Sequence, residues 1–501
     1  MTATADNNTI LRSERIARGI LPGVLTSFDM VAIFVAIVLW IPQAAVMSGA
    51  GPAAYIYWIL GFVTFLIPGA IVTGQLGLMF PGEGSLYIWT TRAFGNFMGF
   101  LAGFYAWWPG ILSLISAGDA VVSLLQNLGN LSGVELLSDP GQQGLVIILV
   151  TTISFLLSIF RFRVTQNLVN VIFVTYGGAI LLIGVAGVLW LLSGHPSNTN
   201  LSLQSGHWNL TGSNFTFYGV VILALLGIEV PLNMGVEIRD MRSVTRYLLW
   251  GSIVVMVAYL LATFGVMVAV PLRDQSNPSA VVEAVEQGFG PVSKFLAIVV
   301  DLIFVGFFLF AATVFNYSFA RLLFVSGLDR RLPAVVSKVN ANKVPWMAVL
   351  IQSTIVALFV TIIFMIAPIA FPTLSPRDIS TIVYDILLAA VTVIWCVSMI
   401  ILFVDVVFIH RKYRDAFSRI HLAPDWVFYL CAVVGALAST FGIYVTFTAP
   451  WTTLVAGEAW MTWIISVTLI SLFVAIVVYY IGQKTIESDV SDEEIIAEVT
   501  R

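Results

Sequence analysis

One apolar segment of the chain is interrupted by residues that do not suit the interior of a membrane. The stretch Leu223–Met234 belongs to an apolar run long enough to cross a bilayer, yet it contains Gly227, Glu229, Pro231 and Asn233. A charged side chain near the centre of a transmembrane helix costs roughly 2.5 to 3.5 kcal/mol on insertion scales, and unsatisfied backbone groups in lipid add several more. Such a segment persists only where it faces protein or a water-filled cavity, so it indicates a site.

The composition indicates that the rest of the chain also lies in a membrane. Of the 501 residues, 59% are hydrophobic and 10% are charged, and the mean hydropathy is +0.98. Because about 20 apolar residues cross a bilayer as a helix, we predict a polytopic all-α membrane protein with twelve spans. They are 24–48, 53–79, 96–125, 144–160, 166–193, 214–236, 247–270, 293–324, 345–367, 380–409, 426–449 and 459–482.

The distribution of Lys and Arg predicts the orientation. With both termini in the cytoplasm, twenty of the 23 Lys and Arg residues fall on the inner side, and only Arg273, Lys294 and Arg377 fall outside. This is the bias expected of cytoplasmic loops, and a missed or extra span would have scrambled it. We therefore expect a multi-pass protein of the cell membrane.

The ends of the chain and its reactive side chains exclude several classes of function. We expect residues 1–20 to be a cytoplasmic tail without a signal-peptide pattern, and residues 483–501 to be an acidic, disordered cytoplasmic tail. Cys396 and Cys431 lie inside predicted spans without histidine neighbours, so we expect no metal site and no other cofactor. The chain has no hydrolase or phosphate-binding motif, so we expect neither an enzyme nor a nucleic-acid partner.

A second interruption lies in the first predicted span. Pro42-Gln43 breaks span 24–48, and the stretch Gly49–Pro52 follows it. The two broken spans are five helices apart, which is the spacing of an inverted repeat of five helices. Paired broken helices at corresponding positions point to a substrate site at mid-membrane, where half-helix N–H groups hold a carboxylate and carbonyls hold an ammonium. The alternative is a pair of simple kinks, because Pro and Gly are common in transmembrane helices.

Three stretches of the sequence resemble amino acid permeases of the amino acid/polyamine/organocation superfamily. Phe80–Gly95, FPGEGSLYIWTTRAFG, is similar to the loop after the second helix of these proteins. Gly227-Ile-Glu229, followed by Glu237, resembles the motif in their sixth helix. Asn316–Pro333, NYSFARLLFVSGLDRRLP, resembles the end of their eighth helix. The matches are in order, and the resemblance covers about residues 20–480.

The resemblance implies a fold and an activity. The expected fold has a ten-helix inverted-repeat core over 21–410, with repeats at about 24–193 and 214–409, followed by two further helices in 411–482. The expected activity is secondary transport of amino acids or related amines by alternating access. We expect either proton-coupled uptake or exchange, with a proton preferred over Na⁺ as the coupling ion. Thr313 and Asn316 are the candidate oxygen ligands for Na⁺, although such residues more often bond their own helix.

The resemblance also implies which atoms bind the substrate. The carboxylate is expected to meet the unwound part of the first span, at about Val35, Ala36 and Ile37, and the amine is expected to meet carbonyls at about Leu223 and Leu226, just before Gly227. The chain departs from the family in two respects. The stretch Phe34–Trp40 lacks the usual glycines, and Leu223 replaces an aromatic residue of some members, which disfavours a strongly cationic substrate.

Several charged residues within the spans are candidates for coupling or gating. Glu229 is either a proton-titrating or gate carboxylate, or a structural acceptor for backbone N–H groups freed at the break. Asp301 either binds a cation or takes a proton, or it pairs with another buried polar group, or it lies closer to the outer interface than its place in the predicted span. Asp119 and Asp385 either line an extracellular vestibule or are solvated at the interface.

A further group of charges is expected at the cytoplasmic ends of the spans. Glu237, Arg92 and Arg321 are candidates for an ion-pair latch at the inner gate, because breaking a desolvated pair costs more than breaking an exposed one. The alternative is simple anchoring of positive residues at the cytoplasmic surface.

The leading hypothesis is a permease for amino acids or related amines in the lipid bilayer. The main rival is a membrane sensor or channel that has kept the fold without transport, because the first span lacks the glycines of the family.

Overall fold

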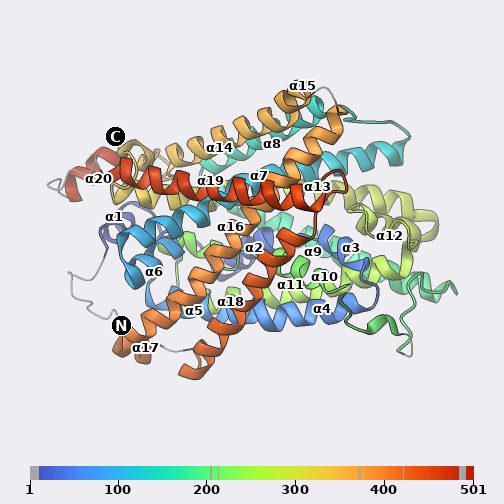
Figure 1. The fold of residues 1–501 in the computed structure, drawn as a ribbon, viewed down its shortest axis with the longest axis horizontal. Coiled ribbons are helices and arrows are strands. Elements are labelled where there is room, and N and C mark those ends of the chain that lie inside the picture. The colour runs from blue at the N-terminus through green and yellow to red at the C-terminus, as the bar shows by residue number, and fades with distance from the viewer. Residues whose placement is uncertain are drawn as a thin grey trace.

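The protein is folded as a bundle of long helices. The computed structural model describes residues 11–203, 206–212, 214–371, 374–420, 422–483 and 492–500. Within these residues the regular structure is helical, apart from two isolated bridges, Leu25 with Ile238 and Glu83 with Met234. Most of the long helices lie roughly along one axis of the molecule (Figure 1). The predicted all-α polytopic membrane class is confirmed at this level.

The helices of the first half cover residues up to Leu192. They are α1 Arg12–Ile20, α2 Ser27–Val38, α3 Pro42–Ser48, α4 Ala53–Gly61, the π-helical turn η2 Phe62–Leu66, α5 Ile67–Met79, α6 Ser85–Phe94, α7 Asn96–Ser132, α8 Pro140–Ile159 and α9 Phe162–Leu192. Helices α4, η2 and α5 form one continuous span.

The second half begins with a short 3-10 turn. Its elements are η3 Gly206–Trp208, α10 Thr216–Ala224, η4 Val230–Asn233, η5 Gly235–Glu237, α11 Arg242–Ala269, α12 Ala280–Gly288, η6 Gly290–Val292, α13 Ser293–Leu328, η7 Ala334–Ser337, α14 Trp346–Thr361, η8 Ile362–Ile366, α15 Ala367–Ala370, α16 Pro376–Lys412, α17 Arg414–Arg419, α18 Asp425–Thr448, α19 Gly457–Gln483 and α20 Asp492–Thr500.

The helices account for most of the predicted spans. Among the described residues, ten helical spans are long and apolar enough to cross a membrane, or eleven if α2 and α3, bent by 45°, count as one. The predicted span 214–236 is different. Its regular helix α10 has only nine residues, and the 3-10 turns η4 and η5 follow. The predicted interruption is therefore a wide break, in which no regular α-helix follows Ala224 until α11 begins at Arg242.

Helix α2 begins where the sequence provides a cap. Thr26 and Asp29 form a capping box, in which the Thr26 N–H donates to Asp29 Oδ2 at 2.7 Å and the Asp29 N–H to Thr26 Oγ1 at 3.4 Å. The buried Asp29 also accepts from Arg163 at 2.5 Å and from Asn170 at 2.6 Å, both on α9. Because a buried carboxylate needs such partners, these bonds fix the start of α2 against α9.

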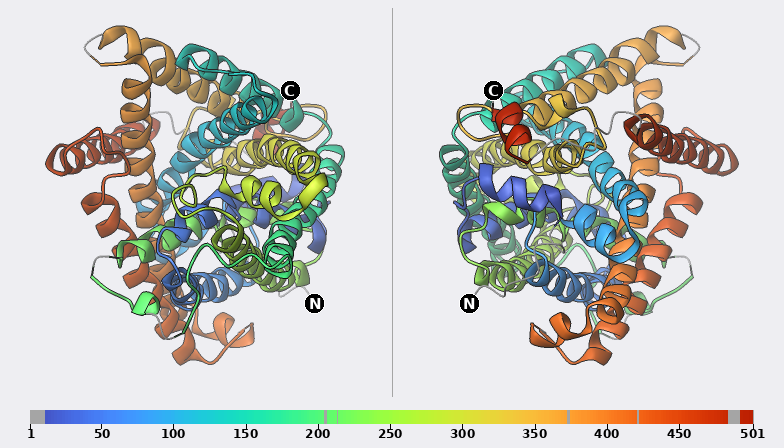
Figure 2. Two further views of the ribbon diagram at one scale, coloured as in Figure 1. Left: turned by 90° about the vertical axis from the view of Figure 1, so that its right-hand side faces the viewer. Right: turned by 90° about the vertical axis from the view of Figure 1, so that its left-hand side faces the viewer.

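The two ends of the bundle carry different elements. Helices α1, α6 and α20 lie at one end and α12 at the other (Figures 1 and 2). The terminal helices α1 and α20 are in contact. The prediction of a disordered tail is wrong for residues 492–500, which form α20, because its apolar residues Ile495 and Val499 find buried positions. Residues 484–491 and 501 of the predicted tail lie outside the described residues.

Candidate functional site

The first break separates α2 from α3 at Leu39–Ile41. Pro42 begins α3, and proline cannot supply the N–H that a continuous helix requires. The freed backbone groups are bonded by two buried tyrosines. The Tyr259 hydroxyl accepts from the Trp40 N–H at 3.0 Å, and the Tyr176 hydroxyl accepts from the Ile41 N–H at 3.4 Å. The Leu39 N–H donates to the Val35 carbonyl at 2.9 Å.

The second break follows α10 and contains a glycine with a positive φ. Gly227 has a φ of +101°, in the region that side chains disfavour. A Cβ at this position would lie 2.5 Å from Ile37 Cγ2 and 3.0 Å from Trp395 Cζ2. Val230 then starts η4, and Pro231 is its second residue. Gly227 therefore allows the second break to pack directly against α2.

Tyr259 of α11 joins the two breaks. Its hydroxyl lies 3.0 Å from the Val38 carbonyl and 3.2 Å from the Ala224 carbonyl, the last residues of α2 and α10. Its ring stacks on Trp58 with centroids 4.1 Å apart. Its single proton is shared between the two carbonyls, which are costly to bury without a partner, so this hydroxyl links the ends of both interrupted helices.

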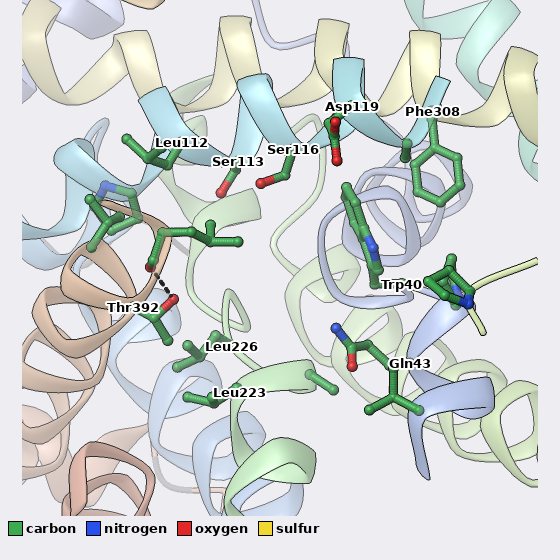
Figure 3. A pocket seen from close by; sticks show the side chains of 18 of the residues that line it. Trp40, Gln43, Leu112, Ser113, Ser116, Asp119, Leu223, Leu226, Phe308 and Thr392 are labelled. Atoms are coloured by element: carbon green, nitrogen blue, oxygen red, sulfur yellow. Dashed lines mark hydrogen bonds between the residues drawn. The ribbon is translucent and has the colours of Figure 1, made fainter. Parts of the chain in front are cut away.

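A cavity of about 500 Å³ adjoins both breaks. Figure 3 shows Ser113, Ser116 and Asp119 of α7 along one side, with Gln43, Leu223 and Leu226 on the other. Pro278 and Ser279, just before α12, also line it. The cavity therefore extends from the breaks toward the end of the molecule that is predicted to be extracellular. Its volume falls in the range of small-molecule sites.

The lining of the cavity contains several aromatic rings and one carboxyl group. Among its described lining residues, Asp119 is the only acidic or basic one, which agrees with the first of the two alternatives for Asp119, a position lining a vestibule. Tyr384 donates to Ser116 Oγ at 2.8 Å beside it. The aromatic lining residues are Trp40, Phe308, Phe315, Tyr384, Trp395 and Trp451. Aromatic faces and a carboxylate attract ammonium groups.

Glu229 lies at the second break and is 1% exposed. Its Oε1 accepts a hydrogen bond from Trp395 Nε1 at 3.1 Å. Its Oε2 is buried and has no hydrogen-bond partner among the described residues. Trp395 itself lines the cavity. The carboxylate is thus one side chain away from the cavity and keeps an oxygen available for a proton.

The predicted substrate-binding residues are close to the cavity but are not all in unwound backbone. Val35, Ala36 and Ile37 lie inside α2, and the break falls at Leu39–Ile41, so the predicted position of the unwound segment is a few residues too early. The reason is that Pro42 removes hydrogen bonds only within the turn before it. Ile37, Leu223 and Leu226 line the cavity, whereas Gly227 lies within the second break, faces Ile37 and is not among the described lining residues.

Three other candidates are engaged in local contacts. Asp301 accepts from Asn127 at 3.3 Å, which agrees with the alternative of pairing with a buried polar group. The Thr313 hydroxyl donates to its own helix at the Leu309 carbonyl. The Asn316 side chain donates to Ser353 at 2.9 Å. None of the three is among the described residues that line the cavity.

The predicted inner charges form two separate clusters. Arg321 pairs with Glu237 at 2.7 Å and with Glu83 at 3.2 Å. Arg92 instead pairs with Glu14 of α1 at 2.5 Å. An ion pair between Glu237 and Arg321 agrees with the expected pairing among these three residues, whereas the described ion pair of Arg92 is with Glu14.

Some residues of the site have no signal in the sequence. These are Tyr176, Tyr259 and Trp395, which are ordinary aromatic residues of long apolar helices. Their role follows only from the hydrogen bonds that their polar atoms form with groups at the two breaks. The argument from Leu223 against cationic substrates also changes, because Trp40, Trp395 and Phe315 supply aromatic faces from other elements.

Comparisons with known proteins agree with the sequence motifs. The profile of the family described as "Amino acid permease" matches residues 25–473. A probable agmatine/putrescine antiporter of Lactococcus lactis is 25% identical, over 68% of this chain and 72% of the relative. A probable GABA permease of Pseudomonas aeruginosa is 25% identical, over 70% and 74%. A branched-chain amino acid permease of Lactococcus lactis is 24% identical, over 67% and 76%.

Proposed function

Because the chain belongs to the amino acid permease family and is a multi-pass transporter of amino acids or amines, we propose that it is a secondary active transporter of small organic amines. The substrate occupies the cavity beside the two helix breaks and is held by its ammonium group. The transport is by alternating access across the cell membrane, with both termini in the cytoplasm. The Lys and Arg bias and the contact of α1 with α20 at one end support this orientation.

The proposal that the substrate is an amine rests on the backbone hydrogen bonds at the first break. The N–H groups of Leu39, Trp40 and Ile41 already donate to Val35, Tyr259 and Tyr176. They therefore leave no free donor for a substrate carboxylate in this state, and the described cavity lining contains no Lys, Arg or His. Asp119 and the aromatic rings suit an ammonium group instead. Agmatine and putrescine, named for one relative, have this chemistry.

The proposed architecture explains why two breaks lie beside one cavity. We take α2–α3 and α10–η5 as the first and sixth of twelve spans, in repeats at about 24–193 and 214–409. The transport core is then 21–410, and α18 and α19 in 411–482 are the two further spans. In an inverted repeat, corresponding helices meet near the centre of the membrane, as the contact of Gly227 with Ile37 supports.

Glu229 is the proposed coupling group at the site. Its unpartnered Oε2 can bind and release a proton without losing the bond from Trp395. Because Glu229 lies within the wide break, its charge state changes the free energy of closing that break around a substrate. Transport is then either proton-coupled uptake or an exchange in which substrate and proton compete.

The test is uptake by the purified protein in proteoliposomes. The panel is labelled agmatine, putrescine, GABA and leucine, with and without a proton gradient, for the wild type and Glu229→Gln. We expect the two amines without a carboxylate to be taken up best. Loss of gradient-stimulated uptake in Glu229→Gln would identify the coupling group, whereas retained stimulation would make Glu229 structural. No uptake of any of the four would contradict the proposed function.

Asp119→Asn tests the contact with the ammonium group. Losing a hydrogen bond to a charged group costs about 1.5 to 3 kcal/mol, so we expect the apparent affinity for the best amine to fall by about 10- to 150-fold. Asp385→Asn is the matched control, because Asp385 is the neighbouring carboxylate on α16 but is not among the lining residues. Equal effects of the two changes would argue against a direct contact with Asp119.

A further inference from the structure

A buried cluster of charges lies at the opposite end of the second break from the cavity. Arg321 of α13 pairs with Glu237 of η5, with Nη2 at 2.7 Å and Nε at 2.8 Å from Oε1. The same Nε lies 3.2 Å from Oε1 of Glu83, in the loop between α5 and α6. All three side chains are at most 2% exposed. Two carboxylates thus share one guanidinium away from water.

The charges of this cluster do not balance when both carboxylates are ionised. One guanidinium neutralises one carboxylate, and burying the remaining charge is unfavourable. A proton on one carboxylate makes the cluster neutral, and like-charge pairs of carboxylates generally hold one proton in this way. Burial first, and then the neighbouring Glu237, raise the pKa of Glu83 well above its usual range, while Arg321 lowers it to a smaller extent.

Other polar groups around Glu83 do not supply a second cation. The Val236 N–H donates to Glu83 Oε2 at 3.2 Å. Tyr317, one turn before Arg321, is neutral at ordinary pH and bonds to Gln166 of α9. Glu14 of α1 approaches the neighbouring Gly82, but it is paired with Arg92. Among the described residues, the ion pairs of Glu83 and Glu237 are both with Arg321.

The cluster is attached to the broken helix itself. Glu237 lies eight residues after Glu229, at the end of the segment formed by η4 and η5. The loop of Glu83 is bonded to the same segment, because the Gly84 N–H donates to the Asn233 carbonyl at 2.8 Å and Ser85 Oγ donates to Asn233 Oδ1 at 2.6 Å. A movement of this segment therefore changes the contacts of both carboxylates with Arg321.

We infer that Glu83, held with Glu237 against Arg321, is a proton-carrying gate that keeps the inner end of the molecule closed while the proton is bound. This inference rests on the proposed alternating-access function and adds a second proton site to that at Glu229. On opening, water reaches the cluster, the O–H bond of the Glu83 carboxyl breaks, and its proton passes to cytoplasmic water. Glu83 then remains as a hydrated carboxylate, and closure takes the proton back.

The direction of the pH dependence follows from the raised pKa. A group whose pKa is higher in the closed state stabilises that state at pH values below its hydrated pKa, and this stabilisation is lost as the pH rises through the closed-state value. A rise in cytoplasmic pH therefore favours opening of the inner end. A single linked proton limits the change to about tenfold per pH unit.

The test measures opening without a substrate. Val325 is buried one turn after Arg321 and faces Gly84, so Val325→Cys, with Cys396 and Cys431 replaced by alanine, reports on access from the inner side. The full chain in inside-out vesicles is labelled with a membrane-impermeant maleimide between about pH 5.5 and 8.5, the range in which desolvated carboxyl groups generally titrate. Rates are normalised to Asn342→Cys at an exposed position, because the thiolate fraction itself rises with pH.

We expect the normalised rate at Val325→Cys to rise with pH by up to about tenfold per unit. Glu83→Gln, which resembles the protonated acid, is expected to give a low rate at all pH values. Glu237→Gln leaves a balanced pair of Glu83 and Arg321, so its rate is also expected to be independent of pH. Glu14→Gln is the matched control, because Glu14 is a buried carboxylate paired with a different arginine, Arg92, and it is expected to keep the profile of the wild type.

A pH-independent rate in the wild-type background would overturn the proposal, and so would an unchanged profile in both Glu83→Gln and Glu237→Gln. If one of these variants does not fold, the other variant and the wild-type profile still decide. Because the labelling needs no substrate, failure of the uptake panel with a pH-dependent gate would reject the proposed substrate class alone.

Discussion

Gly227 is the residue on which the meeting of the two broken helices depends. Its φ of +101° is one that alanine adopts only with strain. Its missing side chain leaves the space that Ile37 and Trp395 occupy. Two independent requirements, backbone conformation and close approach, thus coincide at one position. The position also precedes Glu229 by two residues, so any shift here moves the carboxylate.

Gly227→Ala is therefore expected to destabilise the protein by about 1 to 3 kcal/mol, the usual cost of a strained backbone residue, and to abolish substrate binding. The measurements are thermal unfolding in detergent and binding of the best amine. Gly178→Ala on α9 is the matched control, because a Cβ there would meet no atom within 4 Å and alanine favours a helix. An equal effect of both changes would show that loss of glycine alone is harmful.

At the scale of elements, α12 covers the outer end of the cavity. Residues 278 and 279 line the cavity directly before α12, and the helix packs against α3 and α9. Its contact with α9 is tight, since a Cβ on Gly288 would lie 2.7 Å from the Ala186 backbone. Burial of Glu283 on α12, together with the nearby Asp274 and Glu286, raises the pKa of its carboxyl.

This raised pKa predicts pH-dependent docking of α12. The stabilising contribution is fully present below the ordinary value of 4.5 and is lost as the pH rises through the raised value. Hydrogen exchange of the α12 amides, corrected for intrinsic rates, is therefore expected to be slowest at low pH. Glu283→Gln should remove this dependence, whereas Glu458→Gln, at an exposed position of α19, should not. A flat profile for the wild type would contradict the prediction.

At the scale of the whole molecule, the two chain ends close the same surface. Ser13 of α1 donates its N–H and its hydroxyl to Asp329, at the end of α13, at 3.0 Å each. The Val339 N–H donates to the Val499 carbonyl of α20 at 3.0 Å. Ile495 and Val499 are each 1% exposed. Helices α1 and α20 thus pack together over the loops that follow α13.

Removal of residues 484–501 is expected to loosen this surface. The two buried side chains of α20 each contribute at most about 1.5 to 3 kcal/mol, so we expect a measurable fall in the unfolding temperature and faster hydrogen exchange in α1. Glu498→Gln is the control, because Glu498 is half exposed in its pair with Arg330 and such an exposed pair is worth under about 1 kcal/mol. Unchanged exchange in α1 after the truncation would contradict a shared packing surface.

The sequence alone determined the class of the protein, the family and the places where two helices are interrupted. Apolar runs specify membrane helices because lipid offers no partner for backbone groups, and Pro42, Gly227 and Pro231 specify breaks because they exclude regular helix locally. Glu229 was recognisable for the same reason, since a carboxylate in an apolar run is costly wherever it lies. All of these signals act within a few residues of the chain.

Only the tertiary structure decided which distant groups satisfy these breaks. Tyr259 comes from a helix more than two hundred residues after the first break, and nothing in its own neighbourhood marks it. The sequence also grouped Arg92 with Glu237. In the fold, Arg92 pairs with Glu14, and Glu83 pairs with Arg321. Partner choice depends on which helices pack together, and packing is set by the whole set of apolar surfaces. The residues of one segment do not contain that information.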